Sequence, residues 1–276
     1  MKIVRVKQRT PEWHEYRSRR ITGSTAAAIL GASKYGTPLT EWLRLTGRRA
    51  PEREETAMMI WGRVTEPVNA ELYRLRFPDR ELAREELTVE HPEIPWLAFS
   101  PDGFVADRKT GRMGVWEAKA PHHFNQDWRS RVPLDAAIQV QIGMACTGLD
   151  WACVSVVICP EIQPFDLDRD PRFIDAAINK LGEFMDYNVA RDIPPAATGS
   201  ELDTDALADL GSSDAAWTIT PEVEDLWANY ATVDAQRKDA EARVDAIKNR
   251  LVQLTGRKMW KEAKAAIESA RKSKAV

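Results

Sequence analysis

Residues 98–119 read AFSPDGFVADRKTGRMGVWEAK, and this segment predicts two short strands joined by a tight turn. Phe104–Ala106 and Met113–Lys119 have strand composition, with the turn residues of 108–111 between them. Side chains alternate along a strand, so Glu117 and Lys119 share one face, ~6–7 Å apart. Asp102 ends the preceding strand, just before Gly103 turns the chain. Hairpin pairing across the turn therefore brings Asp102 beside Glu117.

The segments around this hairpin predict an α/β fold with a central mixed sheet flanked by helices. Thr10-Pro11-Glu12 is a helix start, with a capping hydroxyl, a proline at the first helical position and an acid in the first turn. The predicted helices cover residues 11–20, 26–30, 38–45, 64–75, 133–146 and 170–189. The predicted strands cover 86–91, 96–100, 104–106, 113–119 and 151–159. Strands in the middle with helices before and after favour a sheet covered by helices.

The composition changes after Pro194-Pro195. Residues 199–216 contain five acids and no base together with many small residues, which predicts a linker or loosely ordered loop. Pro221–Leu254 predicts a helix with apolar residues at intervals of three and four, although the interruption at 231–243 argues against a continuous coiled coil. We therefore expect a domain over 1–195, an acidic linker over 196–220, and a helical extension with a basic tail over 221–276.

The overall composition is that of an ordinary globular protein. The 276 residues are 43% hydrophobic and 29% charged, with a net charge of −3, which permits a full core but no uniformly basic nucleic-acid coat. A nuclease is compatible with this charge, because its carboxylates offset basic residues elsewhere. No apolar stretch reaches the ~20 residues that span a bilayer, and the N-terminus does not resemble a signal peptide. We expect a protein of the cytoplasm with no membrane partner.

Cysteine and histidine do not indicate a metal site. Cys146, Cys153 and Cys159 are odd in number and lack C-x-x-C spacing, which disfavours a disulfide scaffold, an iron–sulfur cluster and a cysteine-based zinc site. His122 and His123 are adjacent, so their side chains diverge in a strand. We expect neither histidine to be a metal ligand.

Asp102, Glu117 and Lys119 suit phosphodiester hydrolysis. Mg²⁺ prefers oxygen ligands and commonly takes one or two carboxylates, and it activates bound water and neutralises phosphate charge. A neighbouring lysine can hold the attacking hydroxide and stabilise the phosphoryl oxygens, and the Ala118 carbonyl offers a further oxygen. The alternative is a surface cross-strand pair with a turn aspartate. The apolar residues around these positions favour an enclosed site.

A second group of residues suits the binding of an anion. Ser24 follows Thr22-Gly23 in the first turn of a predicted helix, among free N–H groups at the positive end of the helix dipole. Arg17 on the preceding helix offers a bidentate fork for phosphate. The alternative is that Ser24 only caps the helix.

These motifs together resemble the YqaJ/lambda-exonuclease family of phage recombination nucleases, in the PD-(D/E)XK superfamily. The resemblance spans about residues 9–160 and rests on five pieces in one order. They are Arg17 with Thr22-Gly23-Ser24, Trp61-Gly62-Arg63-Val64-Thr65-Glu66, Ser100-Pro101-Asp102-Gly103, Glu117-Ala118-Lys119 and Gln139-Val140-Gln141. It implies a PD-(D/E)XK restriction-endonuclease-like core, with the C-terminal helical extension as an addition.

The resemblance also implies roles for individual residues. Asp102, Glu117, the Ala118 carbonyl and Glu66 would bind Mg²⁺, and Mn²⁺ would substitute for it. Lys119 would orient and activate the water, and Gln139, with Gln141 as a further candidate, would help to position the nucleophile or the phosphate. From the residues alone, the preferred interpretation of Glu66 is an exposed helix glutamate, and Q-x-Q in a helix is more often a solvated face.

The resemblance assigns the terminal 5′-phosphate of the DNA to Arg17 and Ser24. Arg19 and Arg20 are alternatives for the phosphate arginine, and only the register of the motif favours Arg17.

We therefore expect a Mg²⁺-dependent 5′-to-3′ exonuclease that acts on the ends of linear double-stranded DNA and leaves 3′ single-stranded overhangs. The resemblance further implies a homotrimeric ring around DNA, a single-strand annealing protein as partner, and a phage or prophage origin inside a bacterial host. Two alternatives remain: a monomeric restriction-like or structure-specific endonuclease that uses the same centre, and a non-catalytic DNA-binding or assembly module.

Overall fold

The computed structural model describes residues 1–6, 8–48, 56–121, 128, 130–158, 161–210 and 219–273. The chain forms two compact units, residues 1–212 and residues 213–276.

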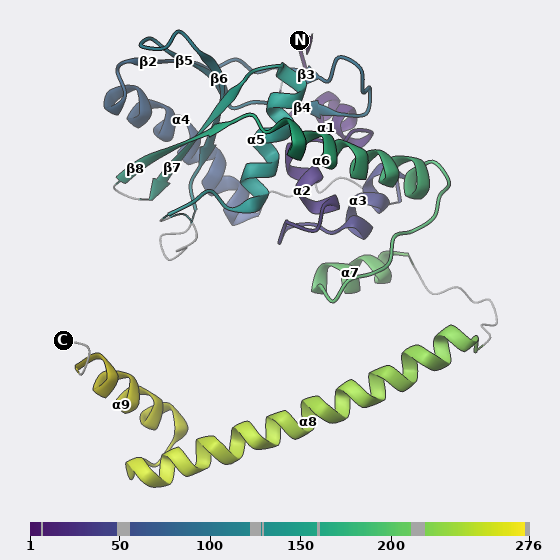
Figure 1. The fold of residues 1–276 in the computed structure, drawn as a ribbon, viewed down its shortest axis with the longest axis vertical. Coiled ribbons are helices and arrows are strands. Elements are labelled where there is room, and N and C mark those ends of the chain that lie inside the picture. Colours follow the sequence, from purple (N-terminus) through teal and green to yellow (C-terminus); the bar gives the residue numbers. More distant parts are fainter. Residues whose placement is uncertain are drawn as a thin grey trace. The chain divides into compact units, whose positions relative to one another are not determined.

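A five-stranded mixed sheet forms the centre of the first unit (Figure 1). Its strand order is β2(Arg80–Ala83), β5(Gly103–Asp107), β6(Met113–Lys119), β7(Trp151–Ile158) and β8(Glu161–Asp168). The neighbours β6 and β7 are parallel, and the other adjacent pairs are antiparallel. The predicted mixed sheet is confirmed, and the hairpin of β5 and β6 pairs Gly103 with Trp116.

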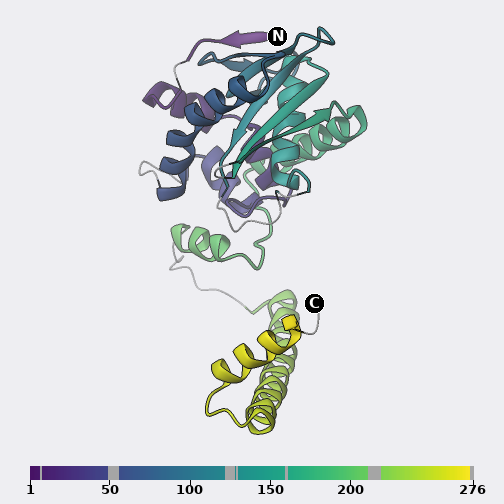
Figure 2. The same ribbon diagram turned by 90° about the vertical axis from the view of Figure 1, so that its left-hand side faces the viewer.

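Helices cover both faces of this sheet, with α4(Ala57–Arg76) on one face and α5(Leu134–Thr147) and α6(Pro171–Glu183) on the other (Figure 2). Strand alternation decides which residues meet which helix. Trp116 and Cys153 pack with Tyr73 of α4, whereas Val115 and Val154 belong to the core cluster that includes α5. Glu117 and Lys119 follow Val115 at even spacing, so their side chains lie on the α5 face.

The N-terminal part adds three helices and a small sheet. Three strands, β1(Lys2–Val4), β3(Thr88–Glu90) and β4(Ala98–Phe99), form this sheet in the order β1-β3-β4. The helices are α1(Pro11–Ser18), α2(Gly23–Ile29) and α3(Pro38–Leu45). The Thr10 hydroxyl accepts a hydrogen bond from the Trp13 N–H, which confirms the predicted start of α1.

Some boundaries and elements differ from the sequence predictions. Helix α4 begins at Ala57, about two turns before the predicted start at Val64, and Thr56 caps it through the Met59 N–H. Strands β2 and β8 were not predicted. β8 alternates exposed and half-buried residues and includes Pro164, and such a pattern is a weak strand signal from sequence alone.

The acidic segment is more ordered than the sequence predicts. Residues 201–209 form helix α7(Glu201–Asp209) rather than a loosely ordered linker. Its Asp203 is only 1% exposed and accepts hydrogen bonds from the hydroxyl of Thr37 and from the N–H and hydroxyl of Thr198. Ala206 is buried in the main core. An acid counted as a linker signal is therefore the anchor of this helix.

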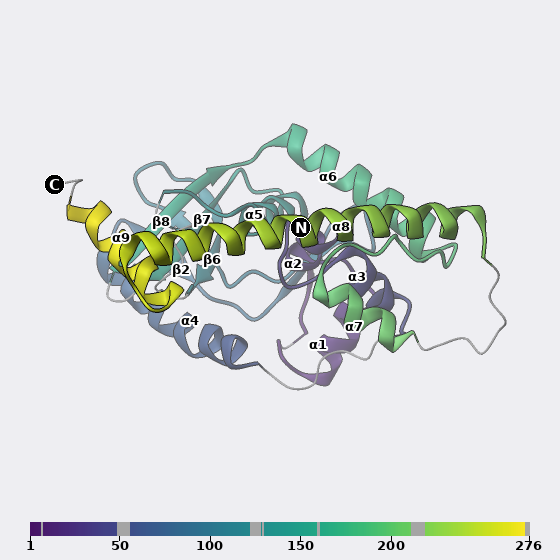
Figure 3. The ribbon, with the colours of Figure 1, turned by 90° about the horizontal axis from the view of Figure 1, so that it is seen from below.

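The described part of the second unit contains two helices, α8(Pro221–Thr255) and α9(Trp260–Ser273). Gly256 adopts a left-handed conformation with φ +63° at the end of α8, which lets the chain reverse. Figure 3 shows α9 beside the C-terminal end of α8. The predicted helix over 221–254 is confirmed, and α9 was not predicted as a separate helix.

The structure bears on three negative predictions. Cys146 and Cys153 are buried free thiols, while Cys159, His122 and His123 lie outside the described residues. Among the helices in the described ranges, none has both the length and the apolar character needed to cross a bilayer.

The anchoring of α7 generates a prediction. Burial opposes ionisation of Asp203, but its hydrogen bonds from Thr198 and Thr37 outweigh burial and lower its pKa below the ordinary 3.8. We expect Asp203→Ala to lower the free energy of unfolding by ~1–3 kcal/mol, measured by chemical denaturation. Because the folded-state pKa is lowered, the contribution is present above pH 3.8 and disappears as the pH falls through the folded-state value.

The matched control is Asp205→Ala, since Asp205 is an exposed acid on the same helix. Equal stability of the two variants at neutral pH contradicts the anchoring role of Asp203.

Candidate active site

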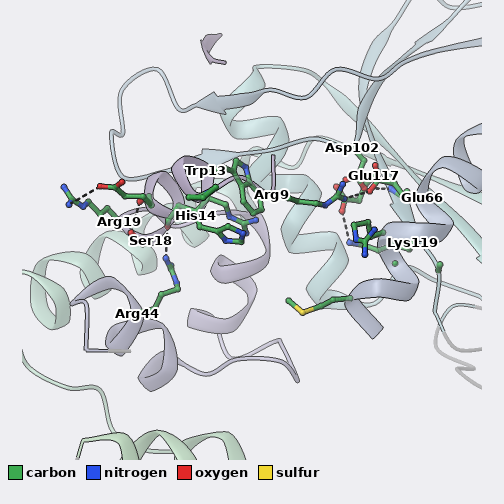
Figure 4. Close-up of a pocket in the computed structure, with 18 of the residues that line it drawn as sticks. Arg9, Trp13, His14, Ser18, Arg19, Arg44, Glu66, Asp102, Glu117 and Lys119 are labelled. Atoms are coloured by element: carbon green, nitrogen blue, oxygen red, sulfur yellow. Dashed lines mark hydrogen bonds and ion pairs between the residues drawn. The ribbon is translucent and has the colours of Figure 1, made fainter. Parts of the chain in front are cut away.

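Asp102, Glu117 and Lys119 lie together in one pocket, as the sequence predicts. They line a cavity of about 1470 Å³ together with Glu66 and Asn69 of α4. Figure 4 shows Asp102, Glu117, Glu66 and Lys119 gathered at one end of this pocket, with Ser18, Arg19 and Arg44 towards the other.

Glu117, Lys119 and Gln139 form a closed hydrogen-bonded triangle. The Glu117 Oε1 atom accepts hydrogen bonds from Lys119 Nζ at 2.7 Å and from Gln139 Nε2 at 2.6 Å. Lys119 Nζ also donates to Gln139 Oε1 at 2.8 Å. Gln139 is half-buried on the second turn of α5, so it faces the site rather than solvent. The triangle joins the C-terminal end of strand β6 to helix α5.

One oxygen of Glu117 has no partner among the described residues. The Glu117 side chain is 4% exposed, and its Oε2 atom is buried without a hydrogen bond in the described part of the chain. A buried carboxylate oxygen in this state costs free energy unless something pairs with it. This oxygen is therefore available for a cation or a water molecule.

Asp102 is held next to Glu117 by the backbone of β6. Its Oδ2 atom accepts a hydrogen bond from the Ala118 N–H at 2.9 Å. Burial, and then the charges of Glu117 and Glu66, raise the pKa of Asp102 well above its ordinary value. Burial disfavours the charged form of Lys119, but Glu117 and Asp102 outweigh it and raise the Lys119 pKa. The site therefore concentrates negative charge that Lys119 compensates only in part.

Helix α4 fixes the end of β6 through side chains to which the sequence analysis gave no role. Asn69 is fully buried and donates to the carbonyls of Lys119 at 3.3 Å and Ser155 at 2.8 Å. Trp61 Nε1 donates to the Ala120 carbonyl at 3.1 Å. Asn69 lies three residues after Glu66, which places both side chains on the same side of α4. This spacing is the sequence signal that could have identified Asn69. These bonds position the Lys119 backbone from the face opposite to α5.

Glu66 lies close to the site but is occupied by arginines. Its Oε2 atom accepts from Arg9 Nη2 at 2.9 Å, and its Oε1 atom pairs with Arg84. Arg9 has a positive φ of 66°, an uncommon backbone conformation outside glycine. Within the described ranges, no group of three His, Cys, Asp or Glu side chains is arranged to hold a metal. Two carboxylates, Asp102 and Glu117, are therefore the acids at the centre.

Arg17 and Ser24 are neighbours, as the motif predicts. Arg17 Nη2 lies 3.4 Å from Ser24 Oγ and 3.1 Å from Thr22 Oγ1, and its guanidinium stacks 4.2 Å from the Trp13 ring centroid. Thr22, not Ser24, is the N-cap residue of α2, so capping does not account for Ser24. Burial, with the Arg44 charge, lowers the Arg17 pKa to about 10, which leaves Arg17 charged at neutral pH.

Gly23 brings the phosphate candidates against the triangle. A Cβ atom at Gly23 would lie 2.8 Å from Gln139 Cγ and 2.9 Å from the Gln139 carbonyl oxygen. These distances are shorter than real Cβ contacts, so a side chain at this position would push α2 away from α5. The absence of a side chain at Gly23 therefore lets Ser24 and Gln139 belong to one surface.

Of the three other candidate residues, Arg20 and Gln141 bond elsewhere in the fold, whereas Arg19 lines the pocket. Arg20 donates to Glu90 Oε1 at 3.0 Å and to the Tyr16 carbonyl, so it is committed to the small sheet. Gln141 lies outside the site, because its side chain bonds the backbone of Asp168 and Asp170. Arg19 is exposed and lines the pocket, so it stays an alternative to Arg17.

The pocket combines a carboxylate end with an arginine-rich wall. The lining arginines are Arg9, Arg17, Arg19, Arg44 and Arg63. Guanidinium groups suit the bidentate binding of phosphate, whereas carboxylates suit a hard divalent cation. The arrangement can hold a phosphodiester chain along the arginines and bring one phosphate to the carboxylates.

Comparison with known proteins identifies the family. The model of the YqaJ-like viral recombinase domain matches residues 12–150, which contain Asp102, Glu117, Lys119 and Gln139 as well as Arg17 and Ser24. The uncharacterized protein YqaJ of Bacillus subtilis (strain 168) is 25% identical over 194 residues. This match covers 68% of the present chain and spans 59% of the length of that relative.

Two solved structures share the fold. The alkaline exonuclease LHK-Exo from Laribacter hongkongensis aligns with a TM-score of 0.53 and 23% identity, over 73% of this chain and 100% of that one. LHK-Exo in complex with dAMP aligns with a TM-score of 0.55 and 22% identity, over 67% and 94% of the two chains. Because the matched domain model covers half of the chain, this protein belongs to the family of YqaJ-like viral recombinase domains.

Proposed function

We propose that this protein is a Mg²⁺-dependent exonuclease that degrades the 5′ strand of linear double-stranded DNA and leaves a 3′ single-stranded overhang. The observation that carries the proposal is the meeting of Asp102, Glu117 and Lys119 in an arginine-lined pocket, where Gln139 hydrogen-bonds both Lys119 and Glu117. The resemblance of the fold to an alkaline exonuclease supports it. We assign the core to the PD-(D/E)XK class on the same grounds.

The residues present fit a divalent cation. Asp102 and the unpaired Oε2 atom of Glu117 would hold it, with the Ala118 carbonyl as a further oxygen. Glu66 would join them only by exchanging its arginine partners for the ion. When bound, Mg²⁺ supplies an activated water and neutralises the charge of the scissile phosphate, and Mn²⁺ has the same ligand preference for oxygen.

Lys119 and Gln139 have separate roles in the proposed reaction. Lys119 donates to two acceptors, so it acts as a hydrogen-bond donor and a positive charge beside the attacking water and the phosphoryl oxygens. Gln139 holds Lys119 and Glu117 in register through its amide, which offers one donor and one acceptor to the pair. Neither role requires Lys119 to lose its proton.

Arg17 and Ser24 would bind the terminal 5′-phosphate. Their contact at 3.4 Å places a guanidinium and a hydroxyl on one spot of the surface, and Gly23 keeps that spot next to Gln139. Recognition of the terminal phosphate would place the first phosphodiester at the carboxylates. This geometry favours an exonuclease over an endonuclease, since the site then requires a DNA end.

The wider setting is part of the same proposal. We infer a homotrimeric ring around DNA, because topology would retain the enzyme on its substrate without a strongly basic surface, in keeping with the net charge of −3. A single-strand annealing protein would receive the 3′ strand in the cytoplasm of a bacterial host that carries the phage or prophage.

The first prediction concerns Lys119. We expect Lys119→Ala to lower the rate of linear-duplex digestion ~100-fold or more, because one positioned donor in a catalytic site is worth this much, while DNA binding remains. Loss of fluorescently labelled duplex and a gel-shift assay measure the two properties. The control is Lys109→Ala, since Lys109 is an exposed turn residue paired with Asp79. Near-normal digestion by the Lys119 variant refutes the assignment.

The second prediction concerns the metal. Isothermal calorimetry should show Mg²⁺ or Mn²⁺ binding to the folded protein, and Glu117→Gln should weaken it ~10-fold or more because a carboxylate ligand is lost. Glu81→Gln, at an exposed residue of β2, serves as the control. Metal binding that is unchanged in the Glu117→Gln variant would place the ion elsewhere. In the unsubstituted protein, removal of the metal with a chelator should stop DNA digestion, and added Mg²⁺ should restore it.

The third prediction concerns the DNA end. A linear duplex with 5′-phosphate at one end and 5′-hydroxyl at the other should be digested from the phosphorylated end. Arg17→Ala should reduce this preference ~10–100-fold, the worth of a charge-assisted hydrogen bond, whereas Arg19→Ala should retain it. The opposite result for the two arginines moves the phosphate site to Arg19. Cleavage of covalently closed circles at a similar rate supports an endonuclease instead.

A further inference from the structure

The second unit has no core of its own. In the described part of residues 213–276, Ala263 is the buried apolar side chain, and α8 buries none of its residues. Large apolar side chains of α8 are nevertheless exposed, among them Val233 at 55%, Val244 at 49% and Ile247 at 60%. A 35-residue helix with an uncovered apolar stripe gains little stability by itself. The exposed apolar stripe of α8 is therefore a candidate surface for binding another helix.

The stripe is a regular heptad seam. Apolar residues of α8 recur at alternating intervals of three and four, and two polar or small residues fill the central places without breaking the spacing. We define the α8 seam as Val223, Leu226, Tyr230, Val233, Arg237, Ala240, Val244, Ile247, Leu251 and Leu254. Such spacing predicts the pairing of one helix with another. The interruption noted from the sequence is therefore a change of residue type within a continuous seam.

The α8 seam is symmetric about its centre, between Lys238 and Asp239. Counting outward from that point, each large apolar position of the seam corresponds to another large apolar position. Val233 corresponds to Val244, Tyr230 to Ile247, Leu226 to Leu251, and Val223 to Leu254, with Arg237 corresponding to Ala240. A second copy of α8 running antiparallel therefore places the eight large apolar residues of the seam opposite one another, with Ala240 opposite Arg237.

The charges along α8 favour the antiparallel direction over the parallel one. Residues 221–229 contain three acids and no base, and residues 248–256 contain two bases and no acid. The antiparallel arrangement puts these two segments side by side, whereas a parallel arrangement puts acid against acid. Charges in the middle of the helix are already paired within it, as in Arg237 with Asp234 and Glu241. These intrahelical ion pairs therefore favour neither the parallel nor the antiparallel arrangement.

Helix α9 leaves most of the seam free. It lies against the C-terminal end of α8, where Leu251, Val252 and Thr255 are half-buried. The seam from Val223 to Ile247 stays exposed beyond it. The occupant therefore needs to match the longer, N-terminal part of α8.

We propose that the α8 seam binds the α8 seam of a second copy of this chain, as a two-fold antiparallel helix pair. This contact goes beyond the nuclease activity and does not depend on it. A two-fold contact differs from the ring proposed for the first unit, because it would link two copies or two rings.

The oligomeric state of the full chain tests the contact. We expect Val244→Glu to reduce the molar mass measured by light scattering about two-fold, because a two-fold contact is lost. This holds for a dimer that becomes a monomer and for paired rings that become single rings. Ala242→Glu adds the same charge at an exposed position off the seam and should leave the mass unchanged. Circular dichroism confirms that both variants keep their helices.

Disulfide trapping tests the direction of the pair. Val233→Cys and Val244→Cys, mixed under oxidising conditions, should form a covalent dimer that neither variant forms alone. In the antiparallel pair, identical positions lie about 16 Å apart along the axis at 1.5 Å per residue, too far for a disulfide. The unsubstituted chain supplies the background for its own cysteines.

Three outcomes overturn the proposal. A molar mass that Val244→Glu does not change means that the first unit or a different protein covers the seam. Cross-linking of each single-cysteine variant with itself indicates a parallel pair. Absence of any cross-link in the mixture, with the parent chain oligomeric, places the contact between copies elsewhere.

Discussion

The candidate site depends on one constraint, the burial of the Glu117 carboxylate next to Lys119. Removing charges from water is expensive, and one partner alone at such a place would be strongly destabilising. Gln139 contributes both a donor and an acceptor to the pair, yet Glu117 Oε2 stays without a partner in the described part of the chain. The fold therefore carries a cost at the point where the proposed cation would bind. A cation there would relieve both the unpaired oxygen and the repulsion between Glu117 and Asp102.

The central hairpin could be predicted because its physics is local. Strand alternation put Glu117 and Lys119 on one face, and the turn at residues 108–111 set the pairing that brings Asp102 near them. The same reasoning could not find β2 or β8, whose pairing depends on distant strands more than on their own composition. It also took Asp203 for part of a linker, because the Thr37 hydroxyl that holds it is distant in the sequence and only the fold brings the two together.

The individual site residues show the same limit. Arg17 and Ser24 were predictable as a pair from spacing across two helices. Arg20 lies three positions after Arg17, just past the end of α1, and only the presence of Glu90 beside it shows that it is used elsewhere. Gln141 differs from Gln139 by two positions, which turns it to another side of α5 and to the backbone after β8. Helical phase is readable from sequence, but which phase meets the site is a property of packing.

Glu66 could contribute to cation binding in two ways, as a direct ligand or through its charge alone. The pKa of Asp102 is raised partly by the Glu66 charge, so Glu66 already acts on the site through space. Its two arginines partly neutralise that charge, and Arg9 lies in the pocket wall where a DNA backbone would compete for it. If DNA phosphates draw Arg9 away from Glu66, the negative charge felt at Asp102 and Glu117 increases. Substrate binding would then strengthen the hold on the cation, and a site that assembles fully only with DNA present follows from these contacts.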